Sequence, residues 1–137
     1  MRAFIDTSAF CALAIPKDRH NLKAKSLYKK LKEQKASFYT SGYVLDEAYT
    51  LLKMRGSHKT AVSFMDQMNE SHITILRVDE EVEEAAKDIF RRVDDRKLSF
   101  TDCTSFALIN MHDMDAAFAF DEHFRYHPFS HPVEFRG

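Results

Sequence analysis

Residues 1–10 read MRAFIDTSAF, an apolar run that ends on one acid and two hydroxyl side chains. The segment 2–6, RAFID, predicts a short buried strand, and a helix is expected over residues 7–14. An aspartate at such a junction is often only the helix N-cap, because its oxygens accept the unpaired amide protons of the first turn. The same position also places Asp6 at the carboxyl end of a strand, where α/β proteins bind ligands. This stretch alone leaves both interpretations open.

Strand and helix patterns alternate along the rest of the chain. Further strands are expected at 36–40, 73–78 and 116–120, with one more in the stretch PVEF near the C-terminus. Helices are expected from Asp18 to about residue 35, from Ser41 to about Met54, and after Ser57, Asp79 and Ser99. Because parallel neighbours need a crossover, usually a helix, we predict a three-layer α/β/α domain with a central, mostly parallel sheet of four to five strands.

The bulk properties favour a single domain over residues 1–137. The chain has 137 residues, of which 45% are hydrophobic, and it contains neither a linker-like tract nor a repeat. It shows neither a membrane-spanning run nor a leader, and Cys11 and Cys103 lie in apolar stretches, so we expect a cytoplasmic protein with reduced cysteines. A net charge of −1 argues against a generally basic nucleic-acid coat but leaves room for a local one.

Two helical stretches have a predictable orientation. In DRHNLKAKSLYKKLKEQK we expect Leu22, Leu27 and Leu31 to form the buried stripe. In YVLDEAYTLL, Glu47 falls roughly 60° from Val44 and borders the apolar face, whereas its neighbour Asp46 points outward by roughly 160°. An acid at the edge of a stripe is usually just solvated, so this position alone does not establish a function.

Two further acids occupy comparable junctions. Asp121 follows AAFAF, so its carboxylate is expected at the same edge of the sheet as that of Asp6 if the two strands are parallel. Asp102 lies three residues after Ser99, the spacing of a capping box, which satisfies helix amides without catalysis. A site at the sheet edge requires this helix to begin there, and the cap geometry is compatible with that arrangement.

With these segments in hand, the sequence resembles the PIN-domain nucleases, and within them the VapC-type toxins of bacterial and archaeal toxin–antitoxin pairs. The matching pieces are FIDTSAF, TSGYVLDEAYTLL, LSFTDCTSFAL and AFAFDEHF, in the family's order from end to end of the chain. The resemblance implies an endoribonuclease that depends on Mg²⁺ or Mn²⁺. It also implies a homodimer and, for toxin members, inhibition by a small cognate antitoxin that inserts a segment into the acidic cleft.

The residues that correspond to the family's catalytic and metal-binding acids are Asp6, Glu47, Asp102 and Asp121. The family's hydroxyl after the first acid matches Thr7 or Ser8, which would support Asp6 by hydrogen bonding. The fourth segment departs from the family pattern, because His123 stands where a second acid or amide is common. Glu122 is a possible substitute.

Carboxylates are the expected ligands here because Mg²⁺ prefers oxygen, and a divalent ion relieves the repulsion between converging acids. RNA must also be held by its phosphates, which lysine and arginine side chains generally contact. The candidates just before the Asp102 helix are Arg91, Arg92, Arg96 and Lys97.

Other interpretations compete with the nuclease. Histidines 123, 127 and 131 recur every fourth residue, which could indicate zinc, but Pro128 and Pro132 break the helical register that would align them. A phosphoryl-transfer protein of the phosphatase or receiver type is a distant possibility, since those proteins need a second acid near the first strand. The main alternative is a catalytically inactive RNA-binding or protein-interaction module that retains the fold and uses its acids as caps.

Overall fold

The computed structural model describes residues 1–137 and contains one five-stranded sheet in which every neighbouring pair is parallel. The strand order is β3-β2-β1-β4-β5. The strands are β1 (Arg2–Ile5), β2 (Ser37–Ser41), β3 (Thr74–Leu76), β4 (Ala116–Phe118) and β5 (Glu134–Arg136). The predicted strand in PVEF is therefore present, and the predicted parallel sheet is confirmed.

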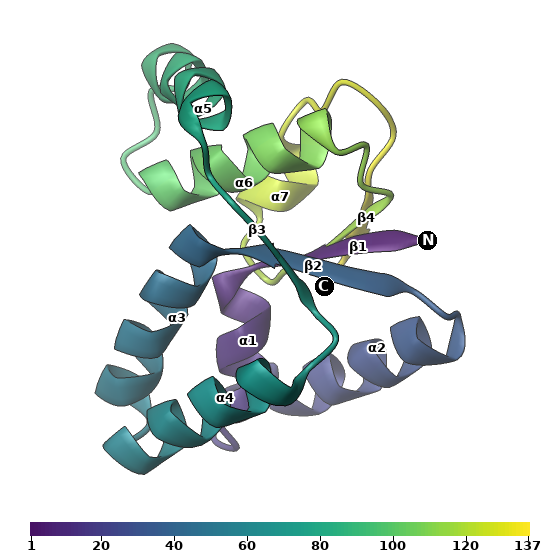
Figure 1. The fold of residues 1–137 in the computed structure, drawn as a ribbon, viewed down its shortest axis with the longest axis vertical. Coiled ribbons are helices and arrows are strands. Elements are labelled where there is room, and N and C mark those ends of the chain that lie inside the picture. Colours follow the sequence, from purple (N-terminus) through teal and green to yellow (C-terminus); the bar gives the residue numbers. More distant parts are fainter.

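Helices cover both faces of this sheet and produce the expected three layers. They are α1 (Thr7–Ala14), α2 (Asn21–Glu33), α3 (Gly42–Arg55), α4 (His58–Glu70), α5 (Glu80–Arg92), α6 (Phe100–Met111) and α7 (His123–Tyr126). Figure 1 shows α1 to α4 on one side of the strands and α5 to α7 on the other. A single cluster of 30 buried apolar residues fills the space between the layers. No helix is both long and apolar enough to cross a membrane.

The strand order places a crevice at the centre of the sheet. From β1 the chain builds outward to β2 and β3 on one side, and later to β4 and β5 on the other. Ligands of open α/β sheets bind where the order reverses in this way, beyond the carboxyl ends of the strands. The backbone amide of Asp6 donates to the carbonyl of Phe118 at 3.0 Å, so the ends of β1 and β4 meet at this crevice.

Two expectations from the sequence need correction. Strand β4 ends at Phe118 rather than at residue 120, so Asp121 lies in the loop beyond the strand instead of directly after it. In α2 the side chain of Leu22 is 81% exposed and does not belong to the buried stripe. The inward face of α2 instead includes Asn21, whose amide donates to the carbonyl of Ala12 at 2.8 Å. Leu22 lies about 180° around the helix from the buried Leu31, so the two side chains point to opposite sides of α2.

Candidate metal centre

Asp6 is the N-cap of α1, and its two carboxylate oxygens have different surroundings. The backbone amide of Ser8 donates to Asp6 Oδ2 at 3.1 Å, and the hydroxyl of Ser8 donates to the same oxygen at 2.5 Å. Asp6 Oδ1 is buried and has no hydrogen-bond partner. Ser8 Oγ also accepts from the amide of Phe120 at 2.9 Å. Of the two hydroxyls that were candidates for supporting Asp6, the structure thus places Ser8 against it, whereas Thr7 Oγ1 points to the carbonyl of Val44.

Asp102 lies in the first turn of α6, where the predicted capping box is present. Ser99 Oγ accepts from the amide of Asp102 at 3.0 Å, and Asp102 Oδ2 accepts from the amide of Ser99 at 3.2 Å. The Asp102 side chain is nevertheless buried, unlike that of a typical surface cap. Its second oxygen, Oδ1, takes no part in the capping box.

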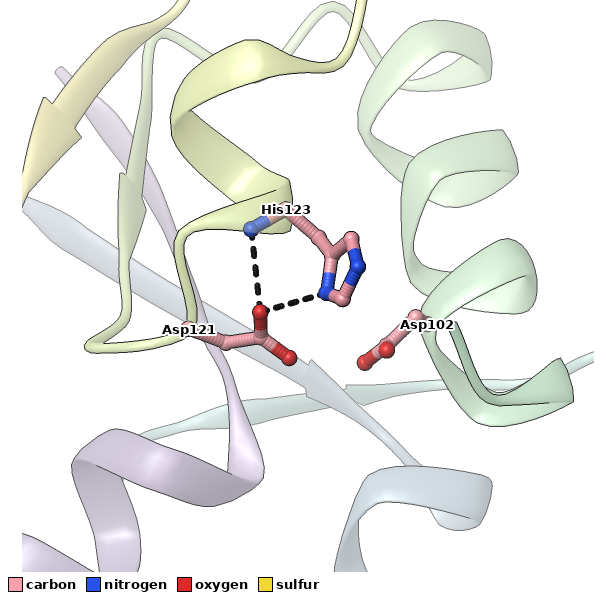
Figure 2. A group of neighbouring side chains, drawn as sticks. All are labelled: Asp102, Asp121 and His123. Atoms are coloured by element: carbon pink, nitrogen blue, oxygen red, sulfur yellow. Dashed lines mark hydrogen bonds and ion pairs between the residues drawn. The ribbon is translucent and has the colours of Figure 1, made fainter. Parts of the chain in front are cut away.

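Asp121 comes from the loop after β4 and is held by His123 at the start of α7. Asp121 Oδ1 accepts from the backbone amide of His123 at 2.9 Å and lies 2.7 Å from His123 Nδ1. Figure 2 shows the other oxygen of Asp121 turned toward the carboxylate of Asp102. Ligand atoms of Asp102, Asp121 and His123 all lie within 4.8 Å of one another.

Glu47 approaches the same place from α3. As predicted, Asp46 is exposed and Glu47 is half-buried beside the apolar face formed by Val44 and Ala48. All four predicted acids line one open pocket at the carboxyl edge of the sheet. The full lining comprises Asp6, Thr7, Ser8, Cys11, Glu47, Leu51, Arg55, Lys97, Ser99, Asp102 and Asp121.

Two acids of this pocket, Asp6 and Asp102, are difficult to ionise when no cation is bound. The pKa of Asp102 is raised from 3.8 to about 7, mainly by burial and in addition by the charges of Asp6 and Asp121. The pKa of Asp6 is raised to about 6, because burial and the charge of Asp121 outweigh the lowering effect of its hydrogen bonds from Ser8. Such shifts are expected where carboxylates are brought together away from water.

Each of the three aspartates therefore uses one oxygen for a local hydrogen bond and leaves the other without such a bond. These hydrogen bonds fix the orientation of the three carboxylates. Asp6 Oδ1, Asp102 Oδ1 and Asp121 Oδ2 remain available to bind a cation. An all-oxygen, negatively charged donor set matches the preference of Mg²⁺ and Mn²⁺ rather than that of softer metals. The residues present thus fit a divalent cation, with Glu47 as the fourth carboxylate of the set.

The basic residues divide into two groups. Lys97 lines the acidic pocket, whereas Arg91, Arg92 and Arg96 are exposed and do not line it, and Arg91 pairs with Asp88 at 3.3 Å. Arg55 lines the pocket and was missed from the sequence. It lies on the same face of α3 as Glu47 and Leu51, at intervals of four residues, a spacing that could have identified it had α3 not been expected to end at Met54.

The three C-terminal histidines have different stacking and hydrogen-bond partners. The ring of His127 stacks on Phe106 with centroids 4.1 Å apart, and burial lowers its pKa to about 4. His131 Nε2 lies 2.7 Å from the carbonyl oxygen of Met114. Because these rings have different partners from that of His123, they do not form the zinc site considered from their spacing. Glu122 pairs with Arg125 at 3.1 Å and does not line the acidic pocket.

Known families and proteins resemble this chain over most of its length. The family model described as "PIN domain" matches residues 3–129. Among curated proteins, the 23S rRNA-specific endonuclease VapC20 of Mycobacterium tuberculosis is 34% identical over 121 residues, which cover 88% of this chain and 90% of that protein.

Two solved structures show the same fold. The crystal structure of Mycobacterium tuberculosis VapC20, described as a sarcin–ricin loop cleaving toxin, matches with a TM-score of 0.81 and 33% identity. The match covers 93% of this chain and 95% of the other. VapBC2 from Rickettsia felis, bound to a DNA fragment from its promoter, matches over the full length of both chains with a TM-score of 0.70 at 14% identity. The second likeness bears on the fold alone.

Proposed function

Because this chain belongs to the PIN-domain family, we propose that it is a metal-dependent endoribonuclease and the toxin of a toxin–antitoxin pair. One observation carries the proposal: four carboxylates from four segments line one pocket, and a buried oxygen of Asp6 has no partner there. Two of the acids, Asp6 and Asp102, do serve as helix caps, as the inactive-module alternative requires. Capping alone, however, does not require Asp6 and Asp102 to lie close to each other and to Asp121, an arrangement in which the pKa values of Asp6 and Asp102 are raised.

We assign Asp6, Asp102 and Asp121 as ligands of Mg²⁺ or Mn²⁺, and Glu47 as a ligand or as the acceptor that orients the attacking water. When bound, the ion neutralises charge on the scissile phosphate and makes water more acidic. Ser8 holds Asp6 in place through its amide and hydroxyl. The substrate class that this assignment implies is RNA, hydrolysed at a phosphodiester bond without a serine or cysteine nucleophile.

A cleavage assay with a defined RNA tests the proposed function. We expect the purified chain to cut an RNA hairpin with the sarcin–ricin loop sequence, or another structured ribosomal RNA, in Mn²⁺ or Mg²⁺. EDTA is expected to stop the reaction, and restored divalent ion to restart it. Cleavage that persists in EDTA would show that the reaction does not need a divalent cation. Metal-independent RNA binding without any cleavage would instead favour the inactive module.

Arg55 and Lys97 are the cations placed to hold the substrate, because both line the pocket that contains the acids. Arg55→Gln is expected to lower kcat/KM about tenfold, mainly through KM. It is also expected to reduce the slope of log(kcat/KM) against log salt concentration by about one, the contribution of one phosphate contact. Arg91→Gln is the matched control, since Arg91 is exposed and paired with Asp88 outside the pocket. Steady-state cleavage at several salt concentrations measures both effects. A loss in Arg91→Gln without one in Arg55→Gln would instead place the RNA over the exposed arginines 91, 92 and 96.

The proposed partners and setting follow from the same assignment. We propose that residues 1–137 act as one domain, that the chain forms a homodimer in the cytoplasm, and that a small cognate antitoxin covers the acidic pocket. Co-purification with the product of a short reading frame directly upstream tests the last of these points.

A further inference from the structure

His123 lies between two acids that come from distant parts of the chain. Its Nδ1 is 2.7 Å from Asp121 Oδ1, and its Nε2 is 2.9 Å from Asp95 Oδ2. Figure 2 shows the imidazole above Asp121 with its second nitrogen directed away from that carboxylate. Both nitrogens of the ring are therefore engaged by carboxylate oxygens.

This arrangement decides between two roles for His123. Its ring lies close enough to Asp102 and Asp121 to be considered a metal ligand. Direct ligation, however, would require Nδ1 to leave Asp121 or Nε2 to leave Asp95. A histidine with both nitrogens occupied acts instead on the ligand next to it, by fixing which carboxylate oxygen is free.

Asp95 is itself anchored to the loop that leads into α6. Its Oδ1 accepts from the backbone amide of Lys97 at 2.9 Å, and its carbonyl accepts from the amide of Leu98 at 3.1 Å. The same loop continues to Ser99, the N-cap that orients Asp102. The contact between Asp95 and His123 thus ties the loop that positions Asp102 to the loop that carries Asp121.

We propose that Asp95 and His123 are positioning residues that act in series to hold Asp121, with Oδ2 free, for the divalent cation. The inference rests on the proposed function and adds two residues to its site. Asp95 holds the imidazole, the imidazole occupies Asp121 Oδ1, and the remaining oxygen faces Asp102.

A double-mutant cycle on Mn²⁺ affinity tests the series. The dissociation constant is measured by isothermal titration calorimetry for the full chain and for Asp95→Ala, His123→Phe and the double variant. Each single substitution is expected to weaken Mn²⁺ binding about tenfold, the scale of outer ligand partners. The double variant is expected to have the same dissociation constant as the single variant that binds Mn²⁺ more weakly, because the effects of two residues that act in series do not add.

Two further variants and one further measurement separate this role from a general structural one. Asp94→Ala removes an exposed acid from the same loop and is expected to leave the dissociation constant within about twofold. Asp95→Asn keeps an acceptor for the Lys97 amide and a group that can bond to neutral imidazole, and it is expected to recover part of the affinity lost in Asp95→Ala. Thermal melting in EDTA shows that each variant is folded.

Single variants that bind Mn²⁺ as tightly as the unmodified chain would overturn the inference, as would losses that simply multiply in the double variant. A loss in His123→Phe without one in Asp95→Ala would make His123 a direct ligand and also overturn it. If the unmodified chain itself neither bound Mn²⁺ nor cleaved RNA, the proposed function would fail instead, and the two failures are therefore distinguishable.

Discussion

Asp6→Asn is expected to lower metal-dependent RNA cleavage by more than about 100-fold, because loss of an outer ligand partner alone costs 10–100-fold. Two donors on Ser8 point at Asp6 Oδ2, so the carbonyl oxygen of asparagine will take that position. Its amide nitrogen then replaces Oδ1, the unpartnered oxygen of the pocket. The substitution therefore removes a negative charge and also presents a donor to the cation.

Cleavage rates at saturating Mn²⁺, with Asp46→Asn as the control, measure this effect. Asp46 is an exposed acid on α3, one position before Glu47, so its loss changes the net charge without touching the pocket. The cap on α1 survives in Asp6→Asn because asparagine can accept from the Ser8 amide. We accordingly expect its melting temperature in EDTA to be no lower than that of the unmodified chain. Activity retained within about threefold would remove Asp6 from the assigned ligands.

Without divalent ions, the free energy of unfolding is expected to fall as the pH rises from about 4 to 8. The pKa of Asp102 is about 7 and that of Asp6 is about 6 in the folded chain, against 3.8 for the ordinary carboxyl group. Over this interval these two carboxyl groups bind more protons in the folded chain than in the unfolded chain, which outweighs the opposite contribution of His127, whose pKa burial lowers to about 4. Rising pH therefore destabilises the folded chain. His123, whose pKa is raised by Asp95 and Asp121 in spite of its burial, contributes in the same direction.

Asp102→Asn isolates the largest part of this slope. Asparagine can still accept from the Ser99 amide and keep the capping box, but it cannot ionise. At pH 8 in EDTA we expect the variant to be more stable than the unmodified chain by about 2–4 kcal/mol, and at pH 4 to be nearly equal to it. Urea unfolding at both pH values measures the difference, with Asp66→Asn, an exposed acid on α4, as the control. A variant less stable at pH 8 would show that ionised Asp102 is not under strain there.

The parts of the molecule that follow local rules could be predicted from the sequence. The period of apolar residues gives the alternating strands and helices, and the rule that parallel strands end at one edge brings Asp6 and Asp121 together. Helical spacing puts Glu47 at the border of the packed face. The capping box at Ser99 and Asp102 is likewise a local pattern, and it is present together with the pocket rather than in place of it.

The parts that depend on distant contacts could not be predicted. The burial of Asn21 depends on the carbonyl of Ala12 in α1, a partner that no pattern within α2 indicates. The pairing of His123 with Asp95 joins the start of α7 to the loop before α6, two segments whose sequences show no shared signal. Arg55 was missed because the glycine after it suggested an earlier helix end, whereas α3 continues through Arg55.

The central claim is that the acids of this pocket bind a divalent cation, and anomalous diffraction from a crystal soaked in Mn²⁺ tests it most directly. The account predicts a strong anomalous peak bounded by the carboxylates of Asp6, Asp102 and Asp121, absent from crystals of Asp6→Asn. A soak at saturating Mn²⁺ that leaves this pocket without a peak would contradict it.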